Sequence, residues 1–189
     1  MNRLFITGIP ASGKSYLANR LAEATGGEAY FLDDLREELG GDERYKKWVN
    51  FYLDQDEKFY YENTNPDLQW KNLVSQSEAI WPAFLEKINS LSNKKHPIIF
   101  ECVNILPHLA KQDLDFPGIV LIGDSYENIL KRNTEEPRWG NTIELQKLEA
   151  KNFFEVERPH YRAEAIKYGY PIFETADEAF TEAIKLLNI

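Results

Sequence analysis

The residues best suited to chemistry form one glycine-rich segment near the N-terminus. Residues 8–15 read GIPASGKS and match the pattern G-x-x-x-x-G-K-[ST] at every fixed position. Glycines let backbone N–H groups approach phosphate oxygens without a Cβ clash, and a helix that begins at such a loop adds the positive end of its dipole. We therefore expect Lys14 to neutralise the β- and γ-phosphates of a nucleotide and Ser15 to bind Mg²⁺. The residues predicted to bind the nucleotide here are Gly8, Ile9, Pro10, Ala11, Ser12, Gly13, Lys14, Ser15 and Tyr16.

Two carboxylates and an arginine follow the second apolar run of the chain. Residues 31–36 read FLDDLR, which places Asp33, Asp34 and Arg36 within one turn of an expected strand end. Phosphoryl transfer needs a carboxylate that holds or deprotonates the acceptor hydroxyl, and a cation often contacts an acceptor that carries negative charge. Alternatively, Asp33 or Asp34 caps a helix and Arg36 is a solvated residue of its first turn.

Short apolar runs alternate with helical patterns along the chain, which predicts an α/β domain with a mostly parallel sheet. The expected strands are 4–7, 29–32, 98–102, 119–122 and 171–173. The expected helices follow the glycine-rich segment and occupy 72–91, 125–132, 142–168 with a break near Pro159, and the C-terminal end. Ligands bind at the carboxyl ends of the strands in such sheets. Because Asp33, Glu101 and Asp124 each lie at or near the end of an expected strand, and the glycine-rich segment also follows one, we expect a single cleft.

The composition limits the class of protein. The 189 residues are enough for one domain, 1–189, and the single cysteine, Cys102, can form no intrachain disulfide; it reads as a small buried side chain on a strand. No apolar run approaches the roughly 20 residues that span a bilayer, and the first residues, MNRLFITG, lack the features of a signal peptide. We therefore expect a cytoplasmic protein without a membrane partner. The net charge of −9 argues against a long nucleic acid as the partner.

The GIPASGKS and DDLR segments resemble those of the small P-loop kinases, a superfamily that includes shikimate and gluconate kinases, polynucleotide 5′-kinases and zeta-type toxins. The resemblance follows the whole chain in element order. It implies a P-loop NTPase three-layer sandwich with a five-stranded parallel sheet of strand order 2-3-1-4-5, and ATP with Mg²⁺ at the loop. It also implies that Asp33 is the general base and that Arg36 contacts an acceptor phosphate, with Asp34 in the same cleft.

The acidic residue expected near Mg²⁺ departs from the usual pattern of a strand that ends in Asp. Residues 98–108, IIFECVNILPH, are similar to the third strand of 2-phosphoglycerate-kinase-like ATPases, where an acidic residue closes the strand. In the resembled fold this strand lies beside the P-loop strand, which favours Glu101 near Mg²⁺. Residues 120–124, VLIGD, offer Asp124 for the same role, but we expect Asp124 to cap the following helix.

Residues 131–142 resemble the mobile lid of small P-loop kinases, which brings arginines onto the phosphates. By this resemblance Arg138 is a catalytic lid residue, and Arg132 contacts the phosphates or the adenine ring. The loop after the last strand would place Thr175 against adenine. Alternatively, both arginines are surface residues that pair with Glu135, Glu136 or Glu144.

Residues 42–91 are expected to form a helical insertion on the acceptor side. Aromatic residues among many charges fill its first part, 42–71, and they either pack as a core, which we favour, or stack bases. The expected activity is ATP-dependent phosphoryl transfer to a hydroxyl of a small or short acceptor, phosphorylated or polyol. Alternatives are a polynucleotide 5′-kinase or toxin-like kinase, and an ATPase or switch module without an acceptor. A GTPase would usually carry N-K-x-D, and residues 93–96, NKKH, fail at the last position.

Overall fold

A parallel five-stranded sheet forms the centre of the computed structural model, which describes residues 2–187. The strands are ordered β2-β3-β1-β4-β5, and each neighbouring pair is parallel. This confirms the predicted sheet and its order. The strands are β1 (Arg3–Gly8), β2 (Glu28–Phe31), β3 (Ile98–Glu101), β4 (Gly118–Leu121) and β5 (Ile172–Phe173).

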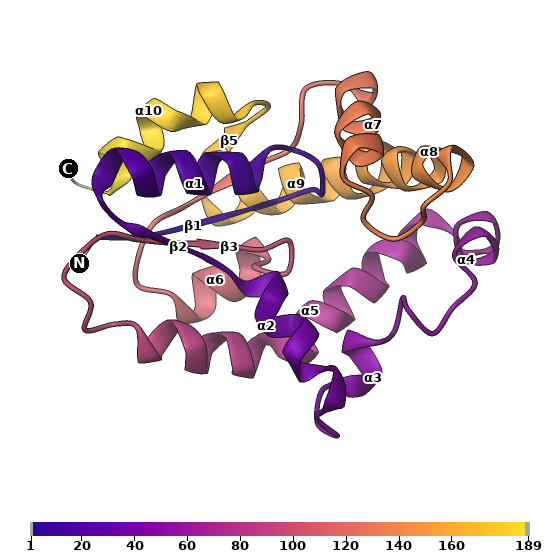
Figure 1. The fold of residues 1–189 in the computed structure, drawn as a ribbon, viewed down its shortest axis with the longest axis horizontal. Helices are drawn as coiled ribbons and strands as arrows, with labels where there is room; N and C mark the ends of the chain where they lie inside the picture. The colour runs from indigo at the N-terminus through magenta and orange to yellow at the C-terminus, as the bar shows by residue number, and fades with distance from the viewer. Residues whose placement is uncertain (1, 188–189) are drawn as a thin grey trace.

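Helices cover both faces of the sheet, which gives the expected three layers (Figure 1). One face carries α1 (Lys14–Thr25) and α10 (Ala176–Leu186), and the other carries α5 (Pro66–Ser90) and α6 (Pro107–Asp113). Across residues 2–187, no helix has the length and apolar character needed to cross a membrane. The other helices are α2 (Leu32–Glu38), α3 (Lys46–Val49), α4 (Glu57–Asn63), α7 (Tyr126–Glu135), α8 (Ile143–Lys151) and α9 (Arg158–Tyr168).

The side chains of β1 alternate between two hydrophobic cores, one on each face of the sheet. Leu4 and Ile6 belong to the core formed with α1 and α10. Phe5 points the other way, into the core formed with α5, α6 and α9. All residues of β1 are buried, as expected for a central strand covered on both faces. The glycine-rich loop follows this strand directly, so a strand buried on both faces fixes its position.

The helix predicted over 72–91 begins earlier than expected. α5 starts at Pro66, because the side chain of Asn65 caps it by accepting a hydrogen bond from Leu68 N at 2.9 Å. Proline suits the first helical position, where its missing N–H has no partner to lose. The helix continues through Pro82, so that proline does not end it.

The break predicted near Pro159 lies instead at Asn152–Glu157, which is π-helical and connects α8 to α9. We call these residues the π segment. Pro159 itself lies in the first turn of α9, where proline is tolerated. π-helical turns are rare in proteins as a whole, but those that do occur are often found at functional sites.

Gly8 ends β1 at a point where the backbone leaves no room for a side chain. Its φ angle is +128°, and a Cβ atom there would lie 1.8 Å from the carbonyl oxygen of Leu121 on β4. Only glycine adopts this backbone conformation freely. The turn from β1 into the glycine-rich loop therefore depends on Gly8.

We expect Gly8→Ala to lower the free energy of unfolding by about 3 kcal/mol or more, because it combines backbone strain with a clash against backbone. Gly41→Ala is the matched control, because a Cβ atom there would meet nothing within 4 Å. The control should change the unfolding free energy by less than about 0.5 kcal/mol. Urea unfolding measures the free energy of unfolding of both variants. Equal values would contradict the requirement for glycine at position 8.

Candidate active site

The glycine-rich loop, hereafter the P-loop (residues 8–15), holds its shape through backbone conformation and two contacts to one carbonyl. Gly13 and Ala11 have positive φ angles of 95° and 56°. The Ser12 hydroxyl and the Lys14 ammonium each donate to the Ile9 carbonyl oxygen at 2.8 Å. α1 begins at Lys14 without a side-chain cap, so its first N–H groups are left for a ligand of negative charge.

Glu101 lies beside the P-loop, at the end of the neighbouring strand. β3 pairs with β1 in a register that sets Glu101 opposite Ile6, and the Glu101 side chain is 3% exposed. Ser15 Oγ donates to Glu101 Oε2 at 2.9 Å, and Lys14 Nζ lies 3.8 Å from Glu101 Oε1. Burial raises the pKa of Glu101, and the charge of Lys14 opposes that shift. The hydroxyl and carboxylate oxygens are the hard ligands that Mg²⁺ takes in proteins, so this pair fits the ion.

Asp124 does not occupy the N-cap position of α7 that was predicted for it. The N-cap of α7 is Ser125, whose side chain accepts from Asn128 N. Asp124 precedes that cap and accepts from Ser125 N at 2.9 Å and from Asn128 Nδ2 at 2.6 Å. The expectation that Asp124 itself caps the helix is therefore wrong, because the shorter serine side chain reaches the first-turn N–H. Asp124 also lies 4.0 Å from Arg132.

Asp33 lies in the first turn of α2, where it meets side chains from two other parts of the chain. Its Oδ1 atom lies 2.9 Å from Arg36 Nη1 and accepts from Cys102 Sγ at 3.4 Å. The N-cap of α2 is Phe31, without a side-chain cap bond, so neither Asp33 nor Asp34 caps this helix. The thiol of Cys102 is buried directly after β3 and contacts a carboxylate. The sequence predicted its burial but not this contact.

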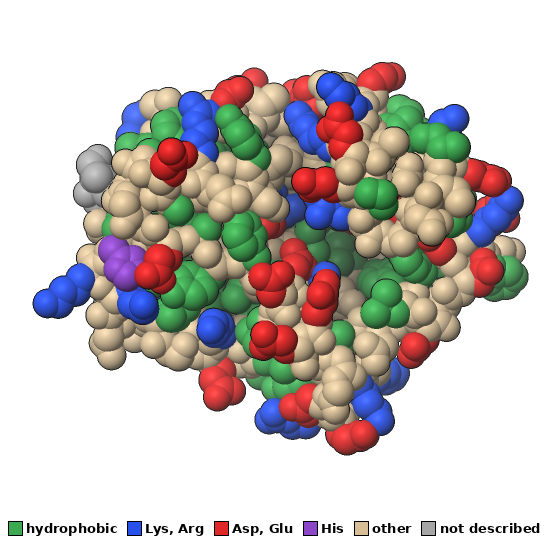
Figure 2. Space-filling model, in the orientation of Figure 1, with side chains coloured by type: hydrophobic (Ala, Val, Ile, Leu, Met, Phe, Trp, Pro, Cys, Tyr) green, Lys and Arg blue, Asp and Glu red, His purple; other side chains and the backbone are tan. Residues whose placement is uncertain are grey.

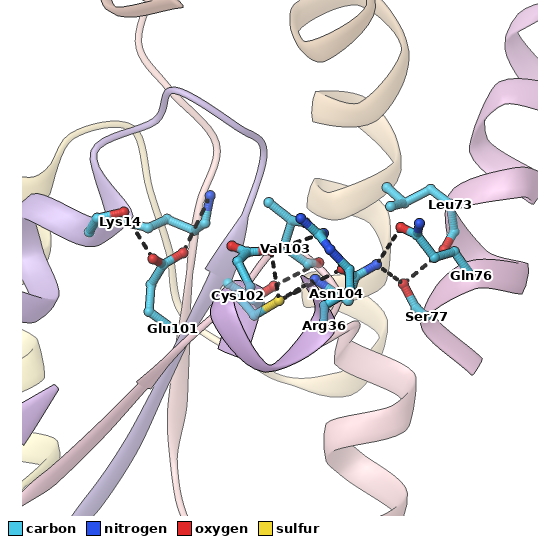
Figure 3. A network of polar contacts seen from close by, with 12 residues as sticks. Lys14, Arg36, Leu73, Gln76, Ser77, Glu101, Cys102, Val103 and Asn104 are labelled. Atoms are coloured by element: carbon cyan, nitrogen blue, oxygen red, sulfur yellow. Dashed lines mark hydrogen bonds and ion pairs between the residues drawn. The ribbon is translucent and has the colours of Figure 1, made fainter. Parts of the chain in front are cut away.

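A buried asparagine that the sequence did not single out holds Arg36 in place (Figure 3). Arg36 Nη1 donates to Asn104 Oδ1 at 2.8 Å. Asn104 Nδ2 donates in turn to Ser77 Oγ at 2.8 Å and to Gln76 Oε1 at 3.1 Å, both on α5. The chain after β3 is thereby tied to α5 and to α2. No spacing in the sequence indicates this network, because its members come from three separate segments.

Arg132, on α7, contacts the P-loop, and Arg138, in the loop between α7 and α8, lines the same cavity. Arg132 Nη1 donates to the Ala11 carbonyl oxygen at 3.3 Å. Arg138 lies 3.6 Å from the exposed Glu136, and its charge lowers the pKa of Glu101, so it also acts on the centre of the site. Glu144, by contrast, pairs with a lysine of α4 and with neither arginine in the ion pairs of the described residues.

These elements enclose a cavity of about 1180 Å³ that opens on the face shown in Figure 2, where basic and acidic side chains gather around a hollow. Thr175 caps α10 and also lines the cavity, with Gly13 close to the next residue of α10. Gly8 and Ile9 are buried and do not line it. The predicted site residues that line it are Pro10, Ala11, Ser12, Gly13, Lys14, Ser15, Tyr16, Asp33, Asp34, Arg36, Glu101, Arg132, Arg138 and Thr175.

Two carboxyl groups meet behind the α7–α8 loop and join it to α4. Glu149 is fully buried and accepts from Gly140 N at 2.6 Å and from Asn133 Nδ2 at 2.7 Å. Glu57 of α4 faces it, and a Cβ atom on Gly140 would lie 2.4 Å from Glu57 Oε2. Burial raises the pKa of Glu57 to about 8, and its hydrogen bond to Glu149 and the charge of that group act in the same direction. Burial and the neighbouring charge of Glu149 therefore favour the protonated form of Glu57.

We expect the free energy of unfolding to fall as pH rises from about 5 to 8. The unfolded chain releases the Glu57 proton near its ordinary pKa of 4.5, whereas the folded protein keeps it until about 8, so folding takes up a proton in this window. Glu157, whose pKa burial raises to about 7, acts in the same direction. Glu57→Gln should therefore flatten part of the slope.

Urea unfolding at a series of pH values measures this slope. The matched control is Glu62→Gln, an exposed position of the same helix, which should keep the slope of the unaltered protein. A Glu57→Gln variant with an unchanged slope would show that Glu57 is ionised in the folded protein at neutral pH.

Solved structures of kinases share this fold. Shikimate kinase from Acinetobacter baumannii in complex with shikimate matches with a TM-score of 0.55 at 16% identity, over 98% of this chain and 92% of its own. A gluconokinase from Sinorhizobium meliloti has a TM-score of 0.50 at 16% identity, over 98% and 91%. Deoxyadenosine kinase from M. mycoides with bound dATP has a TM-score of 0.50 at 15% identity, over 98% and 97%. No protein-family model and no curated protein sequence matches the chain. With its sheet order and the P-loop that follows β1, the chain has the α/β fold of the small P-loop kinases.

Proposed function

We propose that this protein is a kinase that transfers the γ-phosphoryl group of Mg·ATP to a hydroxyl of a small acceptor. One observation carries the proposal: Lys14, Glu101 and Asp33 face the same cavity from three neighbouring elements of one sheet edge. Asp33 is close enough to Glu101 for its charge to raise the pKa of that carboxyl. A carboxylate that shares a cavity with a phosphate-binding lysine is what phosphoryl transfer to a hydroxyl requires.

The roles follow from the positions. The P-loop N–H groups and Lys14 bind the β- and γ-phosphates, and Thr175 lies on the adenine side. Asp33 accepts the proton of the acceptor hydroxyl, whose oxygen attacks the γ-phosphorus. The bond from that phosphorus to the β–γ bridging oxygen breaks, and ADP leaves with the electron pair. Arg36 holds Asp33 in its orientation, while Asp34 lies beside it in the cavity.

Ser15 and Glu101 would hold Mg²⁺. When bound, the ion supplies positive charge that neutralises the β- and γ-phosphate oxygens. Burial of Glu101 and its bond to Ser15 keep these two oxygen ligands together before any nucleotide arrives. This prior arrangement lowers the cost of ordering the site on binding.

Residues 131–142 act as the lid in this proposal, and 42–91 as the acceptor-side insertion. Arg138, in the lid loop, stabilises charge on the transferring group, and Arg132 binds on the nucleotide side. The ring of Trp139 lies 5.7 Å from that of Tyr52 and 5.7 Å from that of Tyr61, so the lid loop packs on the insertion. A lid that closes against the acceptor side excludes water, which would otherwise hydrolyse ATP.

We expect Asp33→Asn to lower kcat for acceptor phosphorylation by roughly 10²–10⁴-fold, because the variant keeps the shape of the side chain but cannot take the proton. Its affinity for Mg·ATP should stay within about threefold of that of the unaltered protein, because the P-loop is untouched. Glu38→Gln, an exposed position of the same helix outside the cavity, is the matched control. Acceptor-stimulated release of ADP measures kcat.

A constant ADP release that no acceptor stimulates would contradict the kinase proposal and favour an ATPase module. A normal kcat in the Asp33→Asn variant would remove Asp33 from the role of general base. Stimulation by 5′-hydroxyl oligonucleotides alone would favour the polynucleotide 5′-kinase alternative.

A further inference from the structure

The acceptor half of the cavity, lined by α2, α4, α5, residues 49–53 and the π segment, has an acidic character. Among the described side chains that line it, Arg36 is the only cation, and it forms an ion pair with Asp33 at 2.9 Å. The negative potential in this half would therefore repel a phosphate or carboxylate on the acceptor. The carboxylates that line this half are Asp33, Asp34, Glu37 and Glu157.

Glu157, the last residue of the π segment, brings a free carboxyl oxygen to this half. Its side chain is 8% exposed and lines the cavity. Asn152 Nδ2 donates to its Oε1 atom at 2.9 Å, whereas the buried Oε2 atom has no hydrogen-bond partner among the described residues. Burial raises the pKa of Glu157 to about 7, and the charge of Lys14 opposes that shift. A buried polar atom without a partner is costly, and a ligand that donates to it would recover that cost.

Four aromatic rings line the same cavity as Glu157, and we call them the aromatic wall: Tyr52, Tyr60, Tyr61 and Trp139. The rings of Tyr52 and Tyr60 lie 5.6 Å apart, and Trp139 lies within 6.0 Å of each tyrosine ring. Burial raises the pKa of Tyr52 and Tyr61 well above the ordinary value, and the charge of Glu157 adds to both shifts. These phenols stay neutral, and their π faces attract cations.

We propose that Glu157 and the aromatic wall form a subsite for a positively charged amine, so that the acceptor of this kinase is a hydroxylated amine. The inference rests on the proposed phosphoryl transfer, in which Asp33 receives the proton of the acceptor hydroxyl. The ammonium group donates to Glu157 Oε2, and the aromatic faces replace part of its hydration. The hydroxyl end of the same molecule then reaches toward Asp33 and the P-loop.

Release of ADP from Mg·ATP, measured with a library of matched acceptors, tests the proposal. Each hydroxylated amine is paired with a counterpart in which a hydroxyl replaces the amine, called here the deaminated counterpart, and with the phosphorylated form of that counterpart, as glucosamine is with glucose and glucose 6-phosphate. We expect the best acceptor to be an amine whose kcat/KM exceeds that of both counterparts at least about tenfold, which is the effect of one charge-assisted hydrogen bond.

Two variants separate recognition from folding. Glu157→Gln keeps the side-chain shape and removes a buried charge, so the protein should fold, which a thermal melt verifies. It should raise KM for the amine about 10–100-fold, with kcat within about threefold, and should change KM for the deaminated counterpart less than about threefold. Glu155→Gln is the matched control on the same segment, because Glu155 is 60% exposed and pairs with Lys151.

The outcomes distinguish this inference from the proposed function. If a neutral or phosphorylated acceptor is best, or if Glu157→Gln changes KM equally for the amine and its deaminated counterpart, the amine subsite is wrong and the kinase proposal stands. A library in which no amine stimulates ADP release, tested on protein that binds Mg·ATP, also overturns the subsite. Failure to bind Mg·ATP would overturn the proposed function itself.

Discussion

Two opposite charges lie buried side by side where β1 and β3 end, and the other polar groups of the site are arranged around them. The side chains of Lys14 and Glu101 are 6% and 3% exposed, and their charged atoms lie 3.8 Å apart. Burying a charge costs several kcal/mol unless a partner and hydrogen bonds compensate for the lost water. Ile9 and Ser15 supply those bonds. A phosphate group in the P-loop would add compensation for Lys14, so this buried pair is suited to receive an anion.

Polar partners also hold Asp33, the proposed base, in place, through a chain of contacts that reaches α5. Arg36 fixes Asp33, Asn104 fixes Arg36, and α5 fixes Asn104, so the proposed base is oriented by buried polar groups that satisfy one another. Glu157 differs, because one of its buried oxygens lacks a partner. A fully bonded network gives rigidity, whereas a free buried acceptor atom marks a place where a ligand can contribute. The cavity thus combines a rigid network around Asp33 with one buried oxygen, on Glu157, that is open to a ligand.

The sequence predicted those features that depend on local patterns. The P-loop follows from a contiguous motif and the strands from apolar runs, whereas the strand order and the position of Glu101 beside β1 were implied by the resemblance to a known fold. Asn104, the Glu57–Glu149 pair and the free oxygen of Glu157 could not be predicted, because each depends on segments that meet only in the folded chain. The misplaced helix break has a similar cause, since a π-helical turn leaves no signal comparable to that of proline.

Titration calorimetry of Mg·ATP against the unaltered protein and the Lys14→Ala variant tests whether the buried lysine and the P-loop bind phosphate. We expect saturable binding with a Kd between about 1 μM and 1 mM, the range in which enzymes usually bind such substrates, and an affinity at least about tenfold lower in the variant. The affinity should also fall when Mg²⁺ is chelated. An unaltered protein that binds no nucleotide, or a Lys14→Ala variant that binds it equally well, would contradict the claim that the buried lysine and its neighbouring loop form a phosphate site.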